Sequence, residues 1–323
     1  MQLSVIIPTR NRSSLLSVAL ESLMTQDLAS DQFEIIVIDN GSTDDTAARC
    51  KAFSQRTTRF TYRYEQAPGL HIARHLGMRL AKGDVLVYAD DDIQARSSWL
   101  VSIRASFQNQ RVGLVGGKIE PDYESEPPAW VLSMWRRTRH GTMLPQYSVL
   151  DFGDAVIEVE SDFVWGCNFS IRKPLVERAG GFHPDSFPED HIVYRGDGEI
   201  GLARKVQSMG YICLYNPDAA VRHRVSDQRM TLDYVRKRGF SQGISDSYTL
   251  TRHKRLPLNT VEQHGLMMKH HLQQRLRQIL YQPGIGFKRY CQGYRAGFRF
   301  HQRSLVAVPD LLDWVLKESY LDS

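Results

Sequence analysis

The stretch DVLVYADDD, residues 84–92, is a short apolar run that ends in three adjacent aspartates. A continuous apolar run of this length is typical of a strand that is buried on both faces of a sheet. Asp90, Asp91 and Asp92 repel one another and resist removal from water. They become favourable beside a divalent cation, because a hard cation prefers oxygen ligands. The alternative is an acidic turn that caps the next helix.

The same rhythm of apolar run, polar turn and helical pattern recurs from residue 3 to residue 120. The runs are Leu3–Pro8, Glu34–Asp39, Phe60–Tyr64, Asp84–Ala89 and Val112–Lys118. The helical patterns between them are Ser13–Thr25, Asp44–Ser54, Leu70–Ala81 and Ser97–Asn109. This alternation predicts an α/β fold, with a Rossmann-like, mostly parallel sheet flanked by helices. In such sheets ligands bind beyond the carboxyl ends of the strands.

The second half of the chain divides at two points. The Pro-rich stretch from residue 124 to about Tyr147 predicts a loop or lid, and short apolar segments and helices follow it. After Val225 the pattern is helical almost to the end. We therefore predict a catalytic domain over residues 1–225, with a nucleotide-binding half (1–120) and an acceptor half (121–225). A helical C-terminal extension would cover residues 226–323.

Composition predicts a globular chain in a reducing compartment. The 323 residues are 42% hydrophobic, enough for a large core and an appendage. The four cysteines have no paired spacing, which argues against a disulfide framework or a zinc site. No apolar stretch approaches the roughly 20 residues that span a bilayer, and the first residues read as a strand. We expect a cytoplasmic location.

Positive charge is concentrated late in the chain. Residues 222–303 contain 17 Lys and Arg but only four acids, although the whole chain has a net charge of +5. Within KRYCQGYRAGFRF, residues 288–300, the aromatic residues Tyr290, Tyr294, Phe298 and Phe300 recur at helical spacing. This composition predicts an interfacial helix at the inner membrane face. The alternatives are ordinary solvated helix faces, or an aromatic stripe that packs on the catalytic domain or a second subunit. No motif supports a nucleic-acid partner.

Three motifs in order carry a family resemblance. SVIIPTRNR (4–12), VIDNGSTD (37–44) and the aspartate triplet resemble the family-2 glycosyltransferases of the GT-A fold, as do PGLHIARHLG (68–77) and AKGD (81–84). The resemblance covers about residues 3–225. It implies an inverting enzyme that uses a UDP-sugar and Mn²⁺ or Mg²⁺. Its acceptor would be a saccharide, lipid-linked or other hydroxyl, in bacterial polysaccharide or glycoconjugate biosynthesis.

Carried over position by position, the resemblance assigns the donor site. Thr9 would lie against the uridine with Arg10 on the same rim, and Asp39 would contact uracil. Gly69 and Arg74 would line the nucleotide pocket, and Asp90 or Asp91 would approach the ribose. Asp92 would bind the metal. From the residues alone, Asp39 could instead cap a helix.

Later segments supply the expected acceptor side and base. Trp165, Gly166 and Asn168, in VWGCNFSIR (164–172), belong to the segment that would close under donor sugar and acceptor. In YRGDGEI (194–200) the preceding Glu of many family members is absent, so Asp197 is the predicted base and Glu199 the second choice. Asp197 could also cap the next helix. His223 would complete the metal or diphosphate site, unless it is an ordinary surface histidine.

Other classes fit less well. A sugar-nucleotide pyrophosphorylase would show a Gly-rich basic loop after the first strand, and PTRNR (8–12) contains no glycine. A dinucleotide oxidoreductase would show G-x-G-x-x-G there. A nucleotide-sugar-binding module without turnover is a further alternative, although the intact aspartate triplet and Asp197 argue against it.

Overall fold

The first strands of the chain pair in parallel, as their alternation with helices predicts. The computed structural model describes residues 1–323 except 188, 260, 263–264, 266–267, 269–283 and 322–323. The strand β1 (Leu3–Thr9) lies between β2 (Phe33–Asp39) and β4 (Val85–Ala89), and β2 pairs with β3 (Phe60–Tyr64). Every residue of β1, β2 and β4 is buried, which explains their continuous apolar runs.

The rest of the sheet is largely antiparallel, so the sheet is mixed rather than mostly parallel. The strand β11 (Asn168–Arg172) lies antiparallel between β4 and β6 (Val112–Tyr123). The long strand β12 (Ile212–Val225) pairs in parallel with β6, and antiparallel with β5 (Ile93–Ala95) and β10 (Ile157–Val159). Parallel neighbours need a crossover, usually a helix. Between β6 and β11 the chain has one four-residue α-helix and two single-turn 3-10 helices, and none is long enough for a crossover, so this region pairs antiparallel.

The Pro-rich stretch is an ordered extension of the sheet, and the expected loop or lid is wrong. It contains α5 (Ala129–Leu132), β7 (Arg136–Arg137) and β8 (Thr142–Leu144). The strands β7 and β8 continue through β9 (Val149–Asp151) onto β6. Val131, Leu144 and Val149 are buried in a small apolar cluster, and this burial holds the extension in place.

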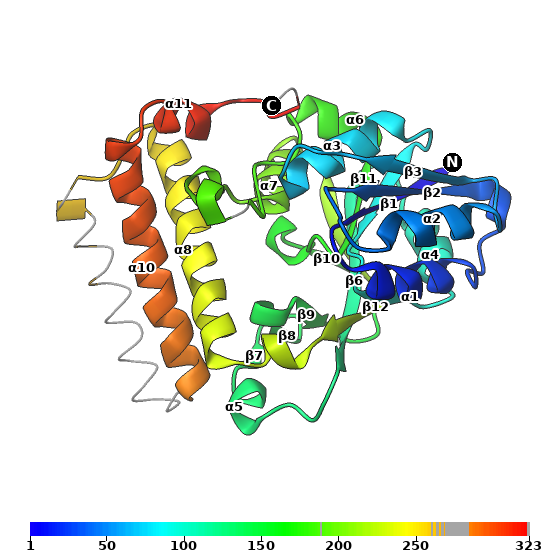
Figure 1. Ribbon diagram of the computed structural model, residues 1–323, viewed down its shortest axis with the longest axis horizontal. Helices are drawn as coiled ribbons and strands as arrows, with labels where there is room; N and C mark the ends of the chain where they lie inside the picture. Colours follow the sequence, from blue (N-terminus) through cyan, green and yellow to red (C-terminus); the bar gives the residue numbers. More distant parts are fainter. Residues whose placement is uncertain (188, 260, 263–264, 266–267, 269–283, 322–323) are drawn as a thin grey trace.

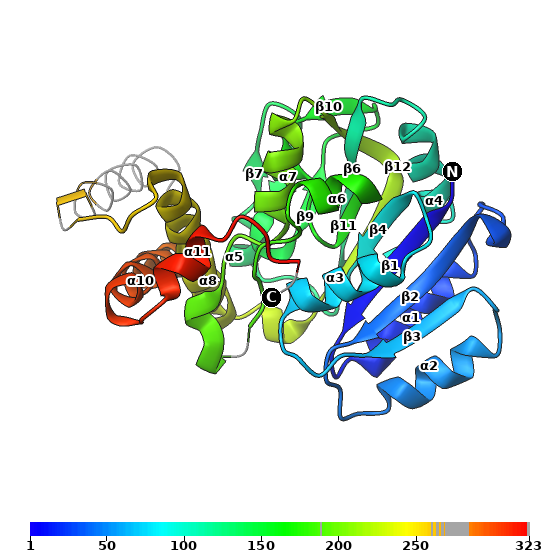
Figure 2. The same cartoon turned by 90° about the horizontal axis from the view of Figure 1, so that it is seen from above.

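Helices cover both faces of the sheet. On one face lie α3 (Leu70–Leu80), α6 (Lys173–Arg178) and α7 (Glu199–Ser208), and on the other α1 (Ser13–Leu23), α2 (Thr46–Ser54) and α4 (Trp99–Ser106) (Figure 1). Figure 2 shows the same arrangement from above. The main apolar core lies between these layers and includes the interiors of β1, β2 and β4. The fold class is therefore α/β with a GT-A-like layer order.

In the described residues of the predicted C-terminal extension there are two long helices, α8 (Leu232–Lys254) and α10 (Ile285–Ala307), and α11 (Leu311–Leu316) follows them. The pair stands beside the sheet domain (Figure 1). None of the helices in the described part of the chain combines the length and apolar character required to cross a bilayer.

Glycines let α8 and α10 touch along their backbones. A Cβ atom on Gly239 or Gly243 of α8 would lie 2.1 Å from a carbonyl oxygen of α10. A Cβ atom on Gly293 or Gly297 of α10 would lie 1.9 Å from a carbonyl oxygen of α8. Each helix thus offers two glycines, four residues apart, to the other, which is how small residues permit close helix crossing.

Candidate active site

Polar residues from neighbouring strands meet at the carboxyl edge of the parallel strands. Thr9 ends β1 directly beside Asp39, which ends β2, and Asp90 follows the last residue of β4. The Thr9 hydroxyl donates a hydrogen bond of 2.7 Å to Oδ2 of Asp91. The ends of strands that are distant in sequence are therefore joined at one rim, as the parallel topology predicts.

Arg12 partly neutralises the aspartate triplet. Its Nη1 lies 3.0 Å from Oδ1 of Asp91 and 3.0 Å from Oδ2 of Asp92. Burial raises the pKa of Asp91 to about 6, although Arg12 opposes the shift. Burial also raises the pKa of Asp90, and the neighbouring Asp92 carboxylate adds to this. For Asp92 burial acts in the same direction, but His223 and Arg12 outweigh it and hold its pKa below the ordinary value.

Strand pairing places His223 against the triplet. His223 of β12 is opposite Ile93 of β5, and the N–H of Arg224 donates to the carbonyl oxygen of Asp92 at 2.9 Å. Nδ1 of His223 lies 2.8 Å from the carbonyl oxygen of Tyr147. Since a carbonyl only accepts, Nδ1 carries the hydrogen, and in the neutral ring Nε2 presents a lone pair.

That lone pair faces a carboxylate oxygen. Nε2 of His223 lies 3.1 Å from Oδ1 of Asp92, and within the described residues this buried oxygen has no hydrogen-bond partner. A protonated His223 would donate to this oxygen, which is how it lowers the pKa of Asp92. With His223 neutral, the two lone pairs face each other, and a bound cation between them would relieve their repulsion. Ligand atoms of Asp90, Asp92 and His223 all lie within 4.8 Å of one another. The three residues therefore fit a divalent metal ion, and the Tyr147 carbonyl orients the histidine for that role.

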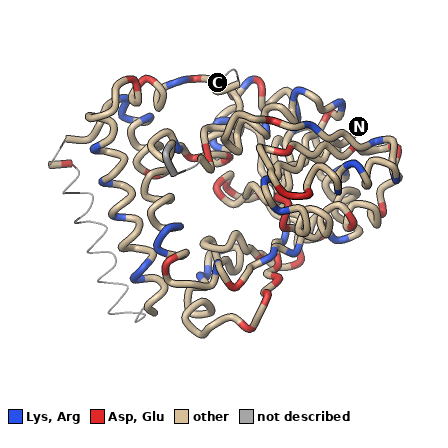
Figure 3. Tube along the Cα trace, viewed as in Figure 1, with Lys and Arg blue, Asp and Glu red and all other residues tan. Residues whose placement is uncertain are grey.

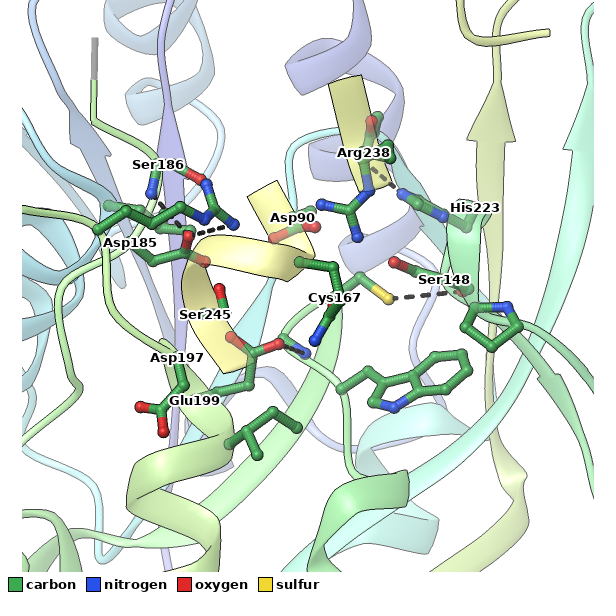
Figure 4. A pocket seen from close by; sticks show the side chains of 18 of the residues that line it. Asp90, Ser148, Cys167, Asp185, Ser186, Asp197, Glu199, His223, Arg238 and Ser245 are labelled. Carbon is green, nitrogen blue, oxygen red and sulfur yellow. Dashed lines mark hydrogen bonds and ion pairs between the residues drawn. The ribbon is translucent and has the colours of Figure 1, made fainter. Parts of the chain in front are cut away.

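A cavity of about 960 Å³ opens beside this cluster (Figure 4). Most of the site residues predicted from the sequence line it: Thr9, Arg10, Arg74, Asp90, Asp91, Asp92, Trp165, Gly166, Asp197, Glu199 and His223. The structure thus brings together residues from both halves of the predicted catalytic domain. Asp39, Gly69 and Asn168 do not line the cavity.

Asp39 is buried just behind the rim, with 1% of its surface exposed. Its Oδ1 accepts a hydrogen bond of 2.8 Å from the N–H of Ser42, and its Oδ2 accepts one of 2.7 Å from the hydroxyl of Tyr62. Each oxygen retains a further lone pair. In this structure Asp39 shapes the turn into α2.

Backbone conformation explains the glycine at position 69, and hydrogen bonds within the protein hold Asn168. Gly69 precedes α3 with φ +136°, and a Cβ atom there would lie 2.9 Å from the ring of His71, so the backbone requires glycine. The side-chain oxygen of Asn168 accepts from Nε1 of Trp99 at 3.0 Å, and its amide donates to the Ala219 carbonyl at 2.8 Å. Neither residue lines the cavity, and the predicted roles of Gly69 at the nucleotide and Asn168 at the sugar stay predictions.

The two candidate bases differ in their surroundings. Oδ1 of Asp197 lies 2.5 Å from Nδ1 of His183, and its Oδ2 accepts from the Thr249 hydroxyl at 2.6 Å. Burial alone would raise the pKa of Asp197, but His183 and Thr249 outweigh it and lower the pKa. Both carboxylate oxygens are therefore engaged, and a proton is held less strongly than by an ordinary aspartate.

Glu199 is the first residue of α7 and is more open. Its side chain is 19% exposed, against 8% for Asp197. Oε1 accepts from the N–H of Gly166 at 3.1 Å, and Oε2 lies 3.2 Å from Nη1 of Arg74. In Figure 4 Glu199 lies between Asp197 and the centre of the pocket.

The aromatic stripe of α10 faces the protein, so its interpretation as a membrane-facing surface is wrong. Tyr290 and Tyr294 line the cavity. Phe298 is 3% exposed and packs with Leu250 and Leu258. The alternative that the stripe packs within the protein is the one the structure supports, because the glycine contacts turn this side of α10 toward α8.

Several cavity residues were missed by sequence reasoning. Arg12 lies in the motif SVIIPTRNR (4–12), but the sequence predicted no role for it. Arg229 was not predicted either, and its Nη1 lies 3.4 Å from Oδ2 of Asp92. The helices α8 and α10 contribute a whole wall, with Arg238, Gln242, Asp246, Tyr290 and Tyr294 among its residues. No motif marks these positions, and only the aromatic spacing on α10 was visible in the sequence.

Known proteins resemble both the sequence and the fold. The family model described as "Glycosyl transferase family 2" matches residues 4–178. The chain is 23% identical over 235 residues to the glucosyl-dolichyl phosphate glucuronosyltransferase of Haloferax volcanii, which covers 70% of this chain and 66% of that protein.

Two solved structures share the fold. The mannosyltransferase PcManGT from Pyrobaculum calidifontis, in complex with GDP-Man and Mn²⁺, gives a TM-score of 0.56 at 18% identity, over 99% of this chain and 84% of that chain. S. aureus TarS 1-349 in complex with UDP gives 0.50 at 15% identity, over 94% of this chain and 92% of that chain. The chain spans between 44% and 66% of the length of the first curated relatives that it matches.

Proposed function

The chain belongs to glycosyl transferase family 2, and on that premise we propose that it transfers a sugar from a UDP-sugar to an acceptor hydroxyl with inversion at the anomeric carbon. One observation carries the proposal: Asp90, Asp92 and His223 form a metal-competent set beside a large cavity at the carboxyl edge of the parallel strands. The nucleotide is inferred from the motif resemblance, and the complexes of the similar folds contain UDP in one case and GDP-Man with Mn²⁺ in the other.

Asp90, Asp92 and His223 would hold Mn²⁺ or Mg²⁺, which when bound neutralises charge on a diphosphate leaving group. Arg12 and Arg229 lie beside Asp92 and would add positive charge where the diphosphate departs. We retain Thr9, Arg10, Arg74 and Asp91 as donor-site residues, because each lines the cavity. The contact of Asp39 with uracil stays a prediction.

We assign the base to Glu199 rather than to Asp197. In a direct displacement the acceptor oxygen attacks the anomeric carbon, its proton passes to a carboxylate, and the bond from the anomeric carbon to the diphosphate oxygen breaks. Only one base is required. Both carboxylates have partners, which are the Gly166 N–H and Arg74 for Glu199 and His183 and Thr249 for Asp197, so the greater side-chain exposure of Glu199 is what supports this role. Asp197 would then be a positioning residue that ties α7 to α8.

Matched isosteric variants test this assignment. In Glu199→Gln we expect UDP and Mn²⁺ to bind as in the wild type, while transfer falls by roughly 10²-fold or more. In Asp197→Asn we expect a lower melting temperature and a smaller loss of transfer. The assignment is reversed if Asp197→Asn loses transfer at wild-type stability while Glu199→Gln stays active. Hydrolysis of UDP-sugars by the wild type separates an enzyme from a binding module without turnover.

We further propose that the acceptor is presented at an anionic surface. Lys288, Arg289, Arg299 and Arg303 of α10 are exposed, and Figure 3 shows basic positions recurring along this helix. Basic residues of this kind are attracted to the inner face of a membrane that bears a lipid-linked acceptor. The Haloferax volcanii relative is named for a glucosyl-dolichyl phosphate substrate. A homodimer through the C-terminal helices is the competing proposal.

A further inference from the structure

Arg238 is an unpaired cation in the cavity wall. It projects from α8 into the cavity and is half-buried, and among the residues that the structure describes it has no hydrogen-bond or ion-pair partner (Figure 4). Five other arginines around the cavity have acidic partners: Arg12 with Asp91 and Asp92, Arg74 with Glu199, Arg195 with Asp185, Arg204 with Asp162, and Arg229 with Asp92. Arg10 is exposed to solvent, and Arg136 stacks on Phe287. A half-buried charge without a partner is unfavourable unless a ligand supplies one.

Tyr290 provides a hydrogen-bond donor beside this cation. It projects from α10 into the same cavity, and in the described part of the chain no hydrogen bond to its hydroxyl is found. Burial raises the pKa of Tyr290 to about 12, although Arg238 and Arg136 oppose the shift, so the hydroxyl keeps its proton near neutral pH. Arg136 of β7, which stacks on Phe287, is thus a second cation within electrostatic range.

We propose that Arg238 and Tyr290, with the charge of Arg136 nearby, bind an anionic group of the acceptor substrate, a phosphate or a carboxylate. A guanidinium and a phenol hydroxyl offer several donors to the oxygens of one anion, and such charge-assisted hydrogen bonds are the strong ones. The inference rests on the proposed function, because it treats the cavity as the place where donor and acceptor meet.

The position of Arg238 favours the acceptor over the donor. Among the carboxylates, the charges of Asp185 and Glu199 raise the pKa of Arg238. Each of them already forms an ion pair with another arginine, Asp185 with Arg195 and Glu199 with Arg74. Glu199 is the proposed base, so an anion held at Arg238 would set the remainder of the acceptor beside that base. On the metal side, Arg229 already lies close to Asp92. The diphosphate therefore has its own cations.

The test uses inorganic phosphate and acetate as probes and the full-length protein. Each anion is titrated by calorimetry, at constant ionic strength, into protein saturated with UDP and Mg²⁺, so that the donor side is filled. The variants are Arg238→Gln and Tyr290→Phe, which removes only the hydroxyl. The control is Lys237→Gln, which removes an exposed positive charge from the neighbouring position of α8.

We expect the wild type and Lys237→Gln to bind at least one anion equally. Arg238→Gln should bind it roughly tenfold or more weakly, the scale of a hydrogen bond to a charged group. Tyr290→Phe should bind it severalfold more weakly, and the tighter probe identifies phosphate or carboxylate as the group. The inference is overturned if neither anion binds, if all variants bind alike, or if Arg238→Gln weakens UDP binding instead. Absence of UDP binding in every variant would refute the proposed function, and the titration without nucleotide would still test the anion site.

Discussion

Replacing Gly297 with alanine should force the two C-terminal helices apart. The added Cβ atom would lie 1.9 Å from the carbonyl oxygen of Phe240 and 2.7 Å from its carbonyl carbon. Carbon and oxygen atoms in close contact are normally about 3.3 Å apart. Both clashing atoms belong to the backbone of α8, so no side-chain rotation can relieve the contact, and the helices must separate by roughly 1 Å.

Two opposing effects set the magnitude. Alanine in a helix interior is favoured over glycine by about 1 kcal/mol, so a site without a clash would be stabilised. Overpacking of a well-packed interface costs about 1–3 kcal/mol. Here the added methyl group meets backbone atoms of Phe240, which cannot rotate away as a side chain can. We expect the clash to win and the free energy of unfolding of Gly297→Ala to fall by about 1–2 kcal/mol.

Urea unfolding of the full chain, followed by circular dichroism, measures the change. The control is Ala296→Gly, at the exposed neighbouring position of the same helix. It should lose about 1 kcal/mol through helix propensity alone. Because Tyr294 and Tyr290 lie on the same contact, only Gly297→Ala should also disturb anion binding in the cavity. Stability of Gly297→Ala equal to or above wild type would refute the backbone contact.

Two further predictions concern the metal and the outer surface. Asp92→Ala should lose Mn²⁺-dependent UDP binding in calorimetry while keeping the wild-type circular dichroism spectrum. The expected reason is that Asp92 serves the bound cation rather than the stability of the fold. Wild-type Mn²⁺ affinity in this variant would refute the metal assignment. The protein should co-sediment with phosphatidylglycerol-rich liposomes at low salt and be released at high salt, and an Arg299→Gln, Arg303→Gln double variant should bind less. No sedimentation at either salt concentration, with a dimer in solution, would favour the homodimer.

The parallel half of the fold is predictable from local sequence. The strands β1, β2 and β4 are buried on both faces, so their apolar runs stand out, and their observed bounds differ from the predicted ones by about a residue. The mixed part is not predictable in this way. Pairing of β12 with both β5 and β6 depends on contacts between distant residues, and short half-exposed strands such as β7 carry little pattern. The domain division after residue 225 stays a prediction.

The residues of the site also divide into those that the sequence predicts and those that it does not. Thr9 and Asp90–Asp92 follow apolar runs, so the topology alone places them at one rim. The choice between Asp197 and Glu199 depended on neighbours from α3 and α8, such as Arg74 and Thr249, which no spacing in the sequence reveals. Arg238 and Tyr290 reach the cavity only because two helices cross at glycines, and that crossing is a property of the packed structure.

The pairing of β5 with β12 also sets an order of assembly. Asp90 and Asp92 leave the ribosome early, whereas His223 follows only after the whole middle of the chain has been synthesised. A nascent or truncated chain that ends at residue 178, where the family match ends, has two of the three proposed metal ligands and lacks the strand that carries the third. The proposed metal site would therefore be complete only after β12 has been synthesised, and metal affinity would report that the N-terminal and later segments have joined.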